Sequence, residues 1–179
     1  IAIVKYWGKK DGQIPCNASL SLTLSESYTE LKATLTEKKN GEEIALEYYF
    51  EGERKEAFEQ RILKYLHKHQ ASFPFLKQYA LVLESTNSFP HSTGIASSAS
   101  AFGALALVLV DLFEQTQGKK ISAEVLQTAS EFARLGSGSA CRSLFPNWAQ
   151  WGRAANDTLG SDSHAVQISE VHEVFHNMH

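Results

Sequence analysis

Hydrophobic and polar residues alternate along much of the first half of the chain, as they do in strands with one buried face. Four segments show this alternation: residues 19–25, 28–36, 44–50 and 79–85. An Asn-Gly pair at residues 40–41, which is typical of a tight hairpin turn, lies between the second and the third segment. We therefore expect the first three segments to form an antiparallel meander, and residues 1–7 to form a further strand.

Helical periodicity replaces the alternation in three segments. In residues 55–69, Phe58, Ile62, Tyr65 and Leu66 fall on one face and charged residues on the other. Residues 97–115 and 122–135 continue the pattern, with Ser122 as the predicted N-cap of the last helix. Because most strands precede most helices, the order favours an α+β fold over a doubly wound sheet.

Composition narrows the possible partners and surroundings. The 179 residues are 43% hydrophobic and 21% charged, which indicates one globular domain or a part of a larger protein. A net charge of -3 gives no electrostatic reason to expect nucleic acid or an anionic membrane as the main partner. Cys16 and Cys141 are too few for a disulfide framework, which favours a reduced, cytoplasmic setting.

Two further features concern the limits of the chain and its longest apolar run. Residues 1–7 already have the pattern of a strand, and the last residues stop without a capping signal, so we expect a longer protein. The apolar run of residues 101–110 has about half the length that a bilayer crossing requires. We therefore interpret it as a core helix.

The stretch NSFPHSTGIASSAS, residues 87–100, leads small hydroxylated residues directly into that apolar helix. The first turn of a helix presents backbone N–H groups without internal partners and carries a partial positive charge. Gly94 permits close approach of an anion, and Ser97 and Ser98 add hydroxyl donors, so the stretch is suited to a phosphate. A serine-capped core helix with a tight entry is the alternative interpretation.

A second stretch of glycine and serine, GSGSACRSLF at residues 136–145, contains an arginine. Arg142 is suited to a bidentate pair with a carboxylate or a phosphate. Two anion-binding segments in one chain indicate either a ligand with two anionic parts or two ligands. A glycine-rich turn with a surface arginine is the alternative.

Near the N-terminus, KYWGKKD places Lys5, Lys9 and Lys10 around two aromatic residues. Such a cluster of cations at a strand end suits a diphosphate, although a solvated basic loop has the same pattern. The following PCNASLS contributes Asn17 and Ser19 as further polar groups.

Taken together, IAIVKYWGKKD, PCNASLSLTLS, NSFPHSTGIASSAS and GSGSACRSLF closely resemble the mevalonate diphosphate decarboxylase family of the GHMP kinase superfamily, from residue 1 to about residue 168. The resemblance implies the α+β fold of a GHMP kinase N-terminal domain (ribosomal protein S5 domain 2-like), a mixed or antiparallel sheet with helices packed on one face. It also implies that residues 1–179 are this domain without its first few residues, and that the C-terminal GHMP domain follows outside them.

The activity implied by the resemblance uses ATP and Mg2+. ATP phosphorylates the 3-hydroxyl of mevalonate 5-diphosphate, and loss of that phosphate with CO2 gives isopentenyl diphosphate. The aspartate that acts as general base is expected beyond residue 179, so residues 1–179 alone are expected to be inactive. The resemblance further implies a homodimer when full length, with no nucleic-acid or membrane partner.

The resemblance also assigns roles to individual residues. Lys5 would lie near the reacting hydroxyl, and Ser139 and Arg142 would grip the carboxylate and the diphosphate. The substrate would be bound by Tyr6, Trp7, Gly8, Lys9, Arg61, Ser137, Gly138, Ser139, Ala140, Cys141 and Arg142. ATP would be bound by Gly94, Ala96, Ser97 and Ser98, with Ser98 as a candidate Mg2+ ligand.

The chain departs from the family pattern in two places besides the missing aspartate. An asparagine expected just before Ile1 as a partner of Arg142 is absent, and Pro146 and Asn147 stand where the family usually has two glycines. We expect the second change to stiffen the turn without altering the chemistry.

Other functions fit parts of the sequence. They are a GHMP-family small-molecule kinase, a non-catalytic module that retains the phosphate loops, and a zinc hydrolase. The last rests on HEVFH, in which His172 and His176 are one helical turn apart around Glu173, with His179 on the same face. Cys141 has no histidine beside it and is interpreted as a packed residue, and His91 as a surface residue or a contact to the nucleotide.

Overall fold

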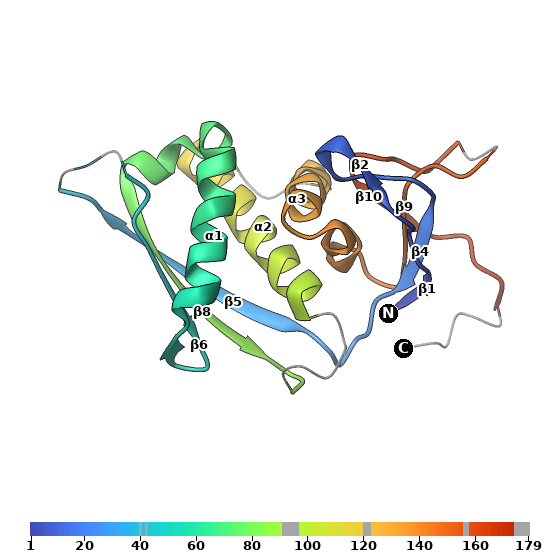
Figure 1. Ribbon diagram of the computed structural model, residues 1–179, viewed down its shortest axis with the longest axis horizontal. Coiled ribbons are helices and arrows are strands. Elements are labelled where there is room, and N and C mark those ends of the chain that lie inside the picture. The colour runs from blue at the N-terminus through green and yellow to red at the C-terminus, as the bar shows by residue number, and fades with distance from the viewer. Residues whose placement is uncertain (40, 42, 91–96, 120–122, 156–157, 174–179) are drawn as a thin grey trace.

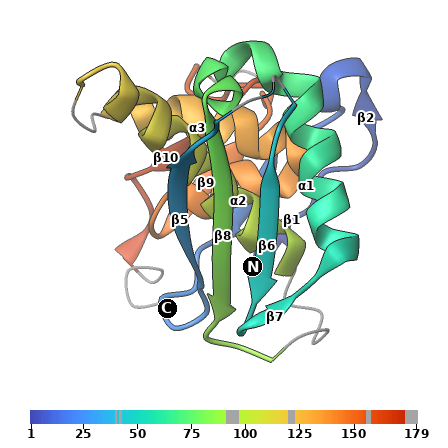
Figure 2. The same cartoon turned by 90° about the vertical axis from the view of Figure 1, so that its left-hand side faces the viewer.

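The fold has three layers, with helices enclosed between two sheets (Figure 1). The structure is a computed structural model that describes residues 1–39, 41, 43–90, 97–119, 123–155 and 158–173. The helices cover one face of the larger sheet, whose other face is open (Figure 2). This α+β arrangement, with helices packed on one face of a mixed sheet, confirms the predicted fold class.

The larger sheet contains β5 (Thr29–Glu37), β8 (Tyr79–Asn87), β6 (Leu46–Phe50) and β7 (Glu53–Arg54), in that order. β5 and β8 are antiparallel, whereas β6 and β8 are parallel. The side chains that β8 and β6 turn toward the helices, including Leu81, Leu83 and Tyr48, are buried. Apolar burial of this kind is the main source of stability in such a layer.

The predicted three-stranded meander is wrong, because β8 lies between β5 and β6. β8 has the more buried inward face and takes an interior position, whereas β5 remains at the edge with polar residues on its outer face. The strand predicted at residues 19–25 is present as β4 (Ser19–Leu22), but it belongs to the other sheet. Residues 23–28 therefore cross from one sheet to the other.

The helical segments agree with the sequence pattern. They are α1 (Glu56–His69), α2 (Ser97–Thr116) and α3 (Ala123–Gly136), with the short helices η2 (Gln70–Ser72) and η3 (Pro74–Lys77) after α1. The predicted cap Ser122 lies outside the described residues. By length and composition α2 would suffice to cross a membrane, but Phe102, Leu105 and Leu109 are buried in the core, as predicted.

The smaller sheet is antiparallel and contains β1 (Ala2–Val4), β4, β9 (Trp148–Trp151) and β10 (Ala165–Ile168), in that order. A two-stranded hairpin of β2 (Lys9–Lys10) and β3 (Ile14–Pro15) stands beside it, with the short helix η1 (Asp11–Gln13) at its tip. The helix η4 (Gly138–Leu144) connects α3 to β9.

Two glycines let α2 approach η4 and the end of α3. A Cβ on Gly103 would lie 3.3 Å from Cβ of Ser143, and a Cβ on Gly136 would lie 2.1 Å from the ring of Phe102. The second distance is too short for any side chain. The helix that follows the serine-rich stretch is therefore in direct contact with the GSGSACRS segment.

Candidate anion-binding site

Arg142 is the buried cation around which the candidate site is built. Its side chain projects from η4 and is 4% exposed. Nε donates to Oγ of Ser21 at 3.1 Å, and Nη1 donates to Oγ of Ser19. Ser19 in turn donates to the carbonyl of Trp151 at 3.1 Å. Three segments far apart in the sequence, η4, β4 and β9, thus fix the direction of one guanidinium.

The charge of Arg142 has no acidic partner within the described part of the chain. Burial lowers the pKa of Arg142, but an arginine stays protonated in a protein. A buried charge without a counter-charge is costly. The two hydroxyls orient the guanidinium without neutralising it, which leaves it suited to an anionic ligand.

Tyr6 and Gly138 bring the KYWGK segment against η4. The rings of Tyr6 and Trp151 are 4.9 Å apart and meet edge to face. A Cβ on Gly138 would lie 3.1 Å from the hydroxyl of Tyr6 and from the ring of Trp151. Glycine is therefore needed at position 138 for this close approach, and two predicted substrate-binding segments are adjacent.

Asn17 fixes the backbone that carries Lys5 and Trp7. Its Oδ1 accepts from N of Trp7 at 2.6 Å, and its Nδ2 donates to O of Lys5 at 3.1 Å. The next residue, Gly8, has a positive φ of 69°, which glycine adopts without strain. Its carbonyl accepts from N of Cys16 at 3.3 Å, so the start of the hairpin is also fixed.

The lysines of this segment are exposed. Lys5, Lys9 and Lys10 form no ion pair with any residue in the described ranges. Trp7 beside them is 76% exposed, which is unusual for so large an apolar side chain. The segment thus presents cations and an aromatic surface next to the buried arginine.

Within residues 137–142 the side chains differ in access. Ser137 and Ser139 are half-buried, whereas Gly138, Ala140 and Cys141 are buried. Burial raises the pKa of Cys141 to about 12, and its Sγ donates to O of Gly138 at 3.1 Å. The interpretation of Cys141 as a packed residue is confirmed, and a substrate contact at Ala140 or Cys141 is restricted to the backbone.

The serine-rich entry to α2 is only partly described. Ser97 and Ser98 are half-buried in the first turn of α2, and Oγ of Ser100 is 2.7 Å from Oγ1 of Thr29. Gly94, Ala96 and His91 lie outside the described residues, so their predicted roles stay predictions. Ser97 precedes the contact at Gly103 by six residues, or about 9 Å of helix.

Arg61 contacts aromatic rings of the core rather than the lysine-bearing segment. It is exposed on α1, and its guanidinium carbon is 4.8 Å from the ring centre of Phe102 and 5.9 Å from that of Phe58. Phe102 itself packs against Gly136, the residue at the end of α3. The aromatic contact therefore holds Arg61 near the start of the GSGSACRS segment.

The turn that departs from the family pattern is accommodated by the fold. Asn147 has a φ of 59°, a left-handed conformation that asparagine tolerates better than most residues. Its carbonyl accepts from N of Thr23 at 2.8 Å, and Oγ1 of Thr23 donates to O of Phe145 at 2.8 Å. These bonds attach the turn to the end of β4.

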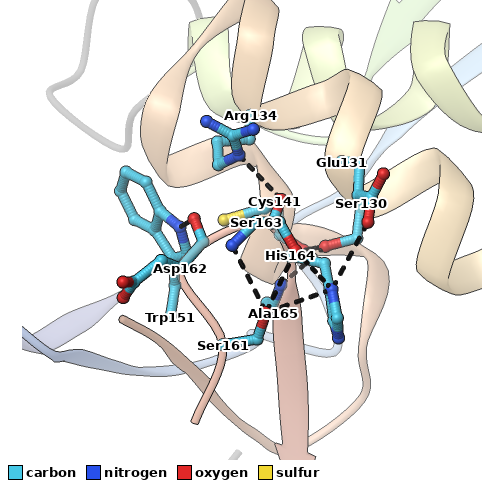
Figure 3. A network of polar contacts seen from close by, with 10 residues as sticks. All are labelled: Ser130, Glu131, Arg134, Cys141, Trp151, Ser161, Asp162, Ser163, His164 and Ala165. Atoms are coloured by element: carbon cyan, nitrogen blue, oxygen red, sulfur yellow. Dashed lines mark hydrogen bonds and ion pairs between the residues drawn. The ribbon is translucent and has the colours of Figure 1, made fainter. Parts of the chain in front are cut away.

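Sequence reasoning missed a buried polar network on α3 (Figure 3). Oγ of Ser130 donates to O of Cys141 at 3.0 Å and accepts from N of Ala165 at 2.9 Å. Arg134 donates through Nε to O of Ser163 at 2.7 Å and through Nη1 to O of Gly12. Nothing in the local pattern distinguishes Arg134 from a solvent-facing arginine at a helix end, where a cation is favourable.

The zinc interpretation gains no support from the described residues. His172 and Glu173 are exposed, and His176 and His179 lie outside the described part. Within the ranges that the structure describes, no group of three or more His, Cys, Asp or Glu residues is placed to hold a metal ion.

Comparisons with known proteins find relatives over most of the chain. A family model of the diphosphomevalonate decarboxylase-like N-terminal domain matches residues 1–165. The diphosphomevalonate decarboxylase of Debaryomyces hansenii is 35% identical over 184 residues, which cover 96% of this chain and 45% of the relative.

Solved structures give the same result. The mevalonate diphosphate decarboxylase from Staphylococcus aureus superposes with a TM-score of 0.72 at 34% identity, over 93% of this chain and 46% of that one. The structure of MDDEF in complex with MVAPP, AMPPCP and magnesium has a TM-score of 0.67 at 32% identity, over 92% and 46% of the two chains. The chain thus spans under half the length of these relatives.

Proposed function

Because this chain belongs to the diphosphomevalonate decarboxylase-like N-terminal domain family, we propose that the whole protein decarboxylates mevalonate 5-diphosphate at the expense of ATP. The products are isopentenyl diphosphate, ADP, phosphate and CO2. Residues 1–179 supply the cations that grip the substrate and the start of the ATP-binding helix. The general base is an aspartate beyond residue 179.

The observation that carries this proposal is the buried and oriented guanidinium of Arg142, which has no acidic partner among the described residues. A carboxylate or a phosphate oxygen of the substrate supplies the missing counter-charge, and planar N–H donors match either group in a bidentate pair. The exposed Lys5 and Lys9 lie on the neighbouring segment, and they add the positive charge that a diphosphate requires.

The chemistry needs positioning and charge neutralisation more than covalent help from the protein. The 3-hydroxyl attacks the γ-phosphorus, its proton passes to the aspartate, and ADP leaves. The C–O bond to the new phosphate then breaks, and the electrons of the C–C bond to the carboxylate form the double bond as CO2 departs. Arg142 holds the carboxylate against the carbon that becomes electron-poor, and Lys5 stabilises charge at the oxygen.

The start of α2 fits the phosphates of ATP. Ser97 and Ser98 offer half-buried hydroxyls at a helix N-terminus, and Gly94 and Ala96 precede them in the sequence. Mg2+ characteristically keeps waters and phosphate oxygens and needs few protein ligands, so the hydroxyl of Ser98 fits this ion better than it fits a metal that requires an acidic cage. When bound, the ion neutralises the charge that develops on the phosphates.

The test is release of CO2 and inorganic phosphate by the full-length protein supplied with mevalonate 5-diphosphate, ATP and Mg2+. Phosphate transfer to the substrate without CO2 would instead indicate a small-molecule kinase. A protein that ends at His179 should show no turnover, because it lacks the base. Turnover within tenfold of the full-length enzyme would place the base inside residues 1–179. Homodimer formation and a cytoplasmic location stay predictions.

A further inference from the structure

Arg134 connects three parts of the site region from inside α3. Its side chain is 7% exposed, and its two bonds go to the carbonyls of Gly12, at the tip of the β2–β3 hairpin, and of Ser163, just before β10. Burial lowers the pKa of Arg134, and no carboxylate within the described ranges forms an ion pair with it. The guanidinium therefore acts as a double hydrogen-bond donor to backbone.

Ser130 lies one helical turn before Arg134 and therefore on the same face of α3. Its hydroxyl links the carbonyl of Cys141, next to Arg142, with the amide of Ala165 on β10 (Figure 3). The two side chains together attach both η4 and the hairpin to one rigid helix. Arg142 on η4 and the lysines of the hairpin are therefore both held in place by α3.

The hairpin needs such a support. Only two residue pairs, Lys9 with Pro15 and Lys10 with Ile14, join its strands, and a two-stranded ribbon is at best marginally stable in water. Gly12 and Gln13 at its tip have positive φ of 70° and 62°. The open end of the hairpin is held by hydrogen bonds of Cys16 and Asn17. Arg134 supplies the hydrogen bond at the other end, the tip of the hairpin.

We propose that Arg134 is a positioning residue that aligns the lysine-bearing hairpin with Arg142 and thereby sets the affinity for the diphosphate end of the substrate. This inference rests on the proposed function, but its structural part is testable without turnover. Arg134 does not contact the substrate, because its guanidinium donates to two backbone carbonyls and its side chain is buried.

The structural part is tested by hydrogen exchange on the full-length protein and on its Arg134→Met and Arg134→Lys variants. Amides of residues 8–16 should exchange at least about tenfold faster in the Met variant, with a smaller increase in the Lys variant, which retains one donor group. Amides of β5 and β8 should be unchanged in both. Unchanged exchange at residues 8–16 in a folded variant would overturn the proposal, and the Lys variant decides if the Met variant does not fold.

The functional part is tested by steady-state kinetics. The KM for mevalonate 5-diphosphate should rise about tenfold in Arg134→Met, while kcat and the KM for ATP change less than threefold, because only substrate alignment is lost. Partial recovery is expected in Arg134→Lys. The matched control is Arg153→Met, which should leave both KM values unchanged. Arg153 is exposed, and its backbone N–H donates to Asp162, the residue before Ser163.

The outcomes separate this proposal from the proposed function. An unchanged KM for the diphosphate substrate, with faster exchange of the hairpin, would overturn the role in affinity. If the parent protein shows no turnover at all, the proposed function fails. The hydrogen-exchange comparison, together with the affinity of parent and variant for inorganic pyrophosphate, still decides the role of Arg134.

Discussion

Glu59 beside the larger sheet and Arg142 beside the smaller sheet are equally buried, each 4% exposed. They differ in whether an oppositely charged side chain neutralises their charge. Glu59 accepts from Nε and Nη2 of Arg54, both at 3.0 Å, and from N of Tyr48 at 3.0 Å. The Arg54 guanidinium holds the pKa of Glu59 below its ordinary value. Among the described residues, the side chain of Arg142 has the hydroxyls of Ser19 and Ser21 as hydrogen-bond partners and no carboxylate.

The difference distinguishes a charge that stabilises the fold from a charge that is available to bind a ligand. A buried ion that is fully paired inside the chain connects elements, here α1 with β6 and β7, and removing one partner destabilises the fold. A buried ion that is oriented but not neutralised has its counter-charge elsewhere, and a ligand is the natural source. The first region is thus complete by itself, whereas the second is arranged to receive an anion.

The largest effect is expected from Arg142→Lys in the full-length protein. We expect kcat/KM for mevalonate 5-diphosphate to fall about 100-fold or more. An ammonium group cannot form the two parallel hydrogen bonds that a planar guanidinium donates to a carboxylate or phosphate. Steady-state kinetics measures this loss. The thermal midpoint should change far less than kcat/KM, because the lysine ammonium can still donate to a serine hydroxyl and no ion pair in the described part of the chain is lost.

Arg153→Lys is the control for that variant, since Arg153 is an exposed arginine to which no such role is assigned. It should retain the parent kcat/KM. A loss under about threefold in Arg142→Lys would remove Arg142 from the site, and the contrast with Glu59 would then lose its functional meaning.

Glu59→Ala should show the reverse pattern. Loss of the carboxylate leaves the buried amide of Tyr48 without its acceptor and Arg54 without its partner, which costs about 2 kcal/mol in the free energy of unfolding. Thermal unfolding followed by circular dichroism measures the change, and kcat/KM of the folded enzyme should stay within twofold. Glu56→Ala, an exposed glutamate in the first turn of the same helix, is the control and should change stability little. An equal stability for both variants would contradict the structural role.

The smallest effect is expected at Asn147, whose turn closes the smaller sheet beside η4. Asn147→Ala should be about 1 kcal/mol less stable than Asn147→Gly, because alanine resists a φ of 59° and glycine does not. Both variants should keep the parent kcat/KM, since the hydrogen bonds of the turn go to Thr23 at the end of β4 and to the backbone carbonyl of Arg142, and leave its guanidinium untouched. Chemical denaturation compares the two, and equal stabilities would show that the turn changes conformation when its residue is replaced.

Local sequence was sufficient for most elements and for part of the site. The alternation in residues 28–36 and 79–85 matches β5 and β8, and the helical spacing of Ile62, Tyr65 and Leu66 matches the buried face of α1. Arg142 and the KYWGK segment were found because glycine, serine and cationic residues have strong local signatures. The pairing of the strands within the sheets was not predicted correctly, because the neighbour of a strand depends on which of its faces distant segments bury.

The sequence by itself determined the three long helices and the strands β4, β5, β6 and β8, but not β2, β3, β9 or β10. It also determined which residues offer anion-binding chemistry and to which family the chain is similar. Only the tertiary structure decided that β8 separates β5 from β6, that Ser19 and Ser21 orient Arg142, and that Arg134 reaches Gly12, 122 positions away in the chain. The physical reason is the distance along the chain over which each kind of interaction acts. Propensity and periodicity act over a few residues, whereas a buried hydrogen bond between distant segments exists only after burial has brought them together and removed the competing water.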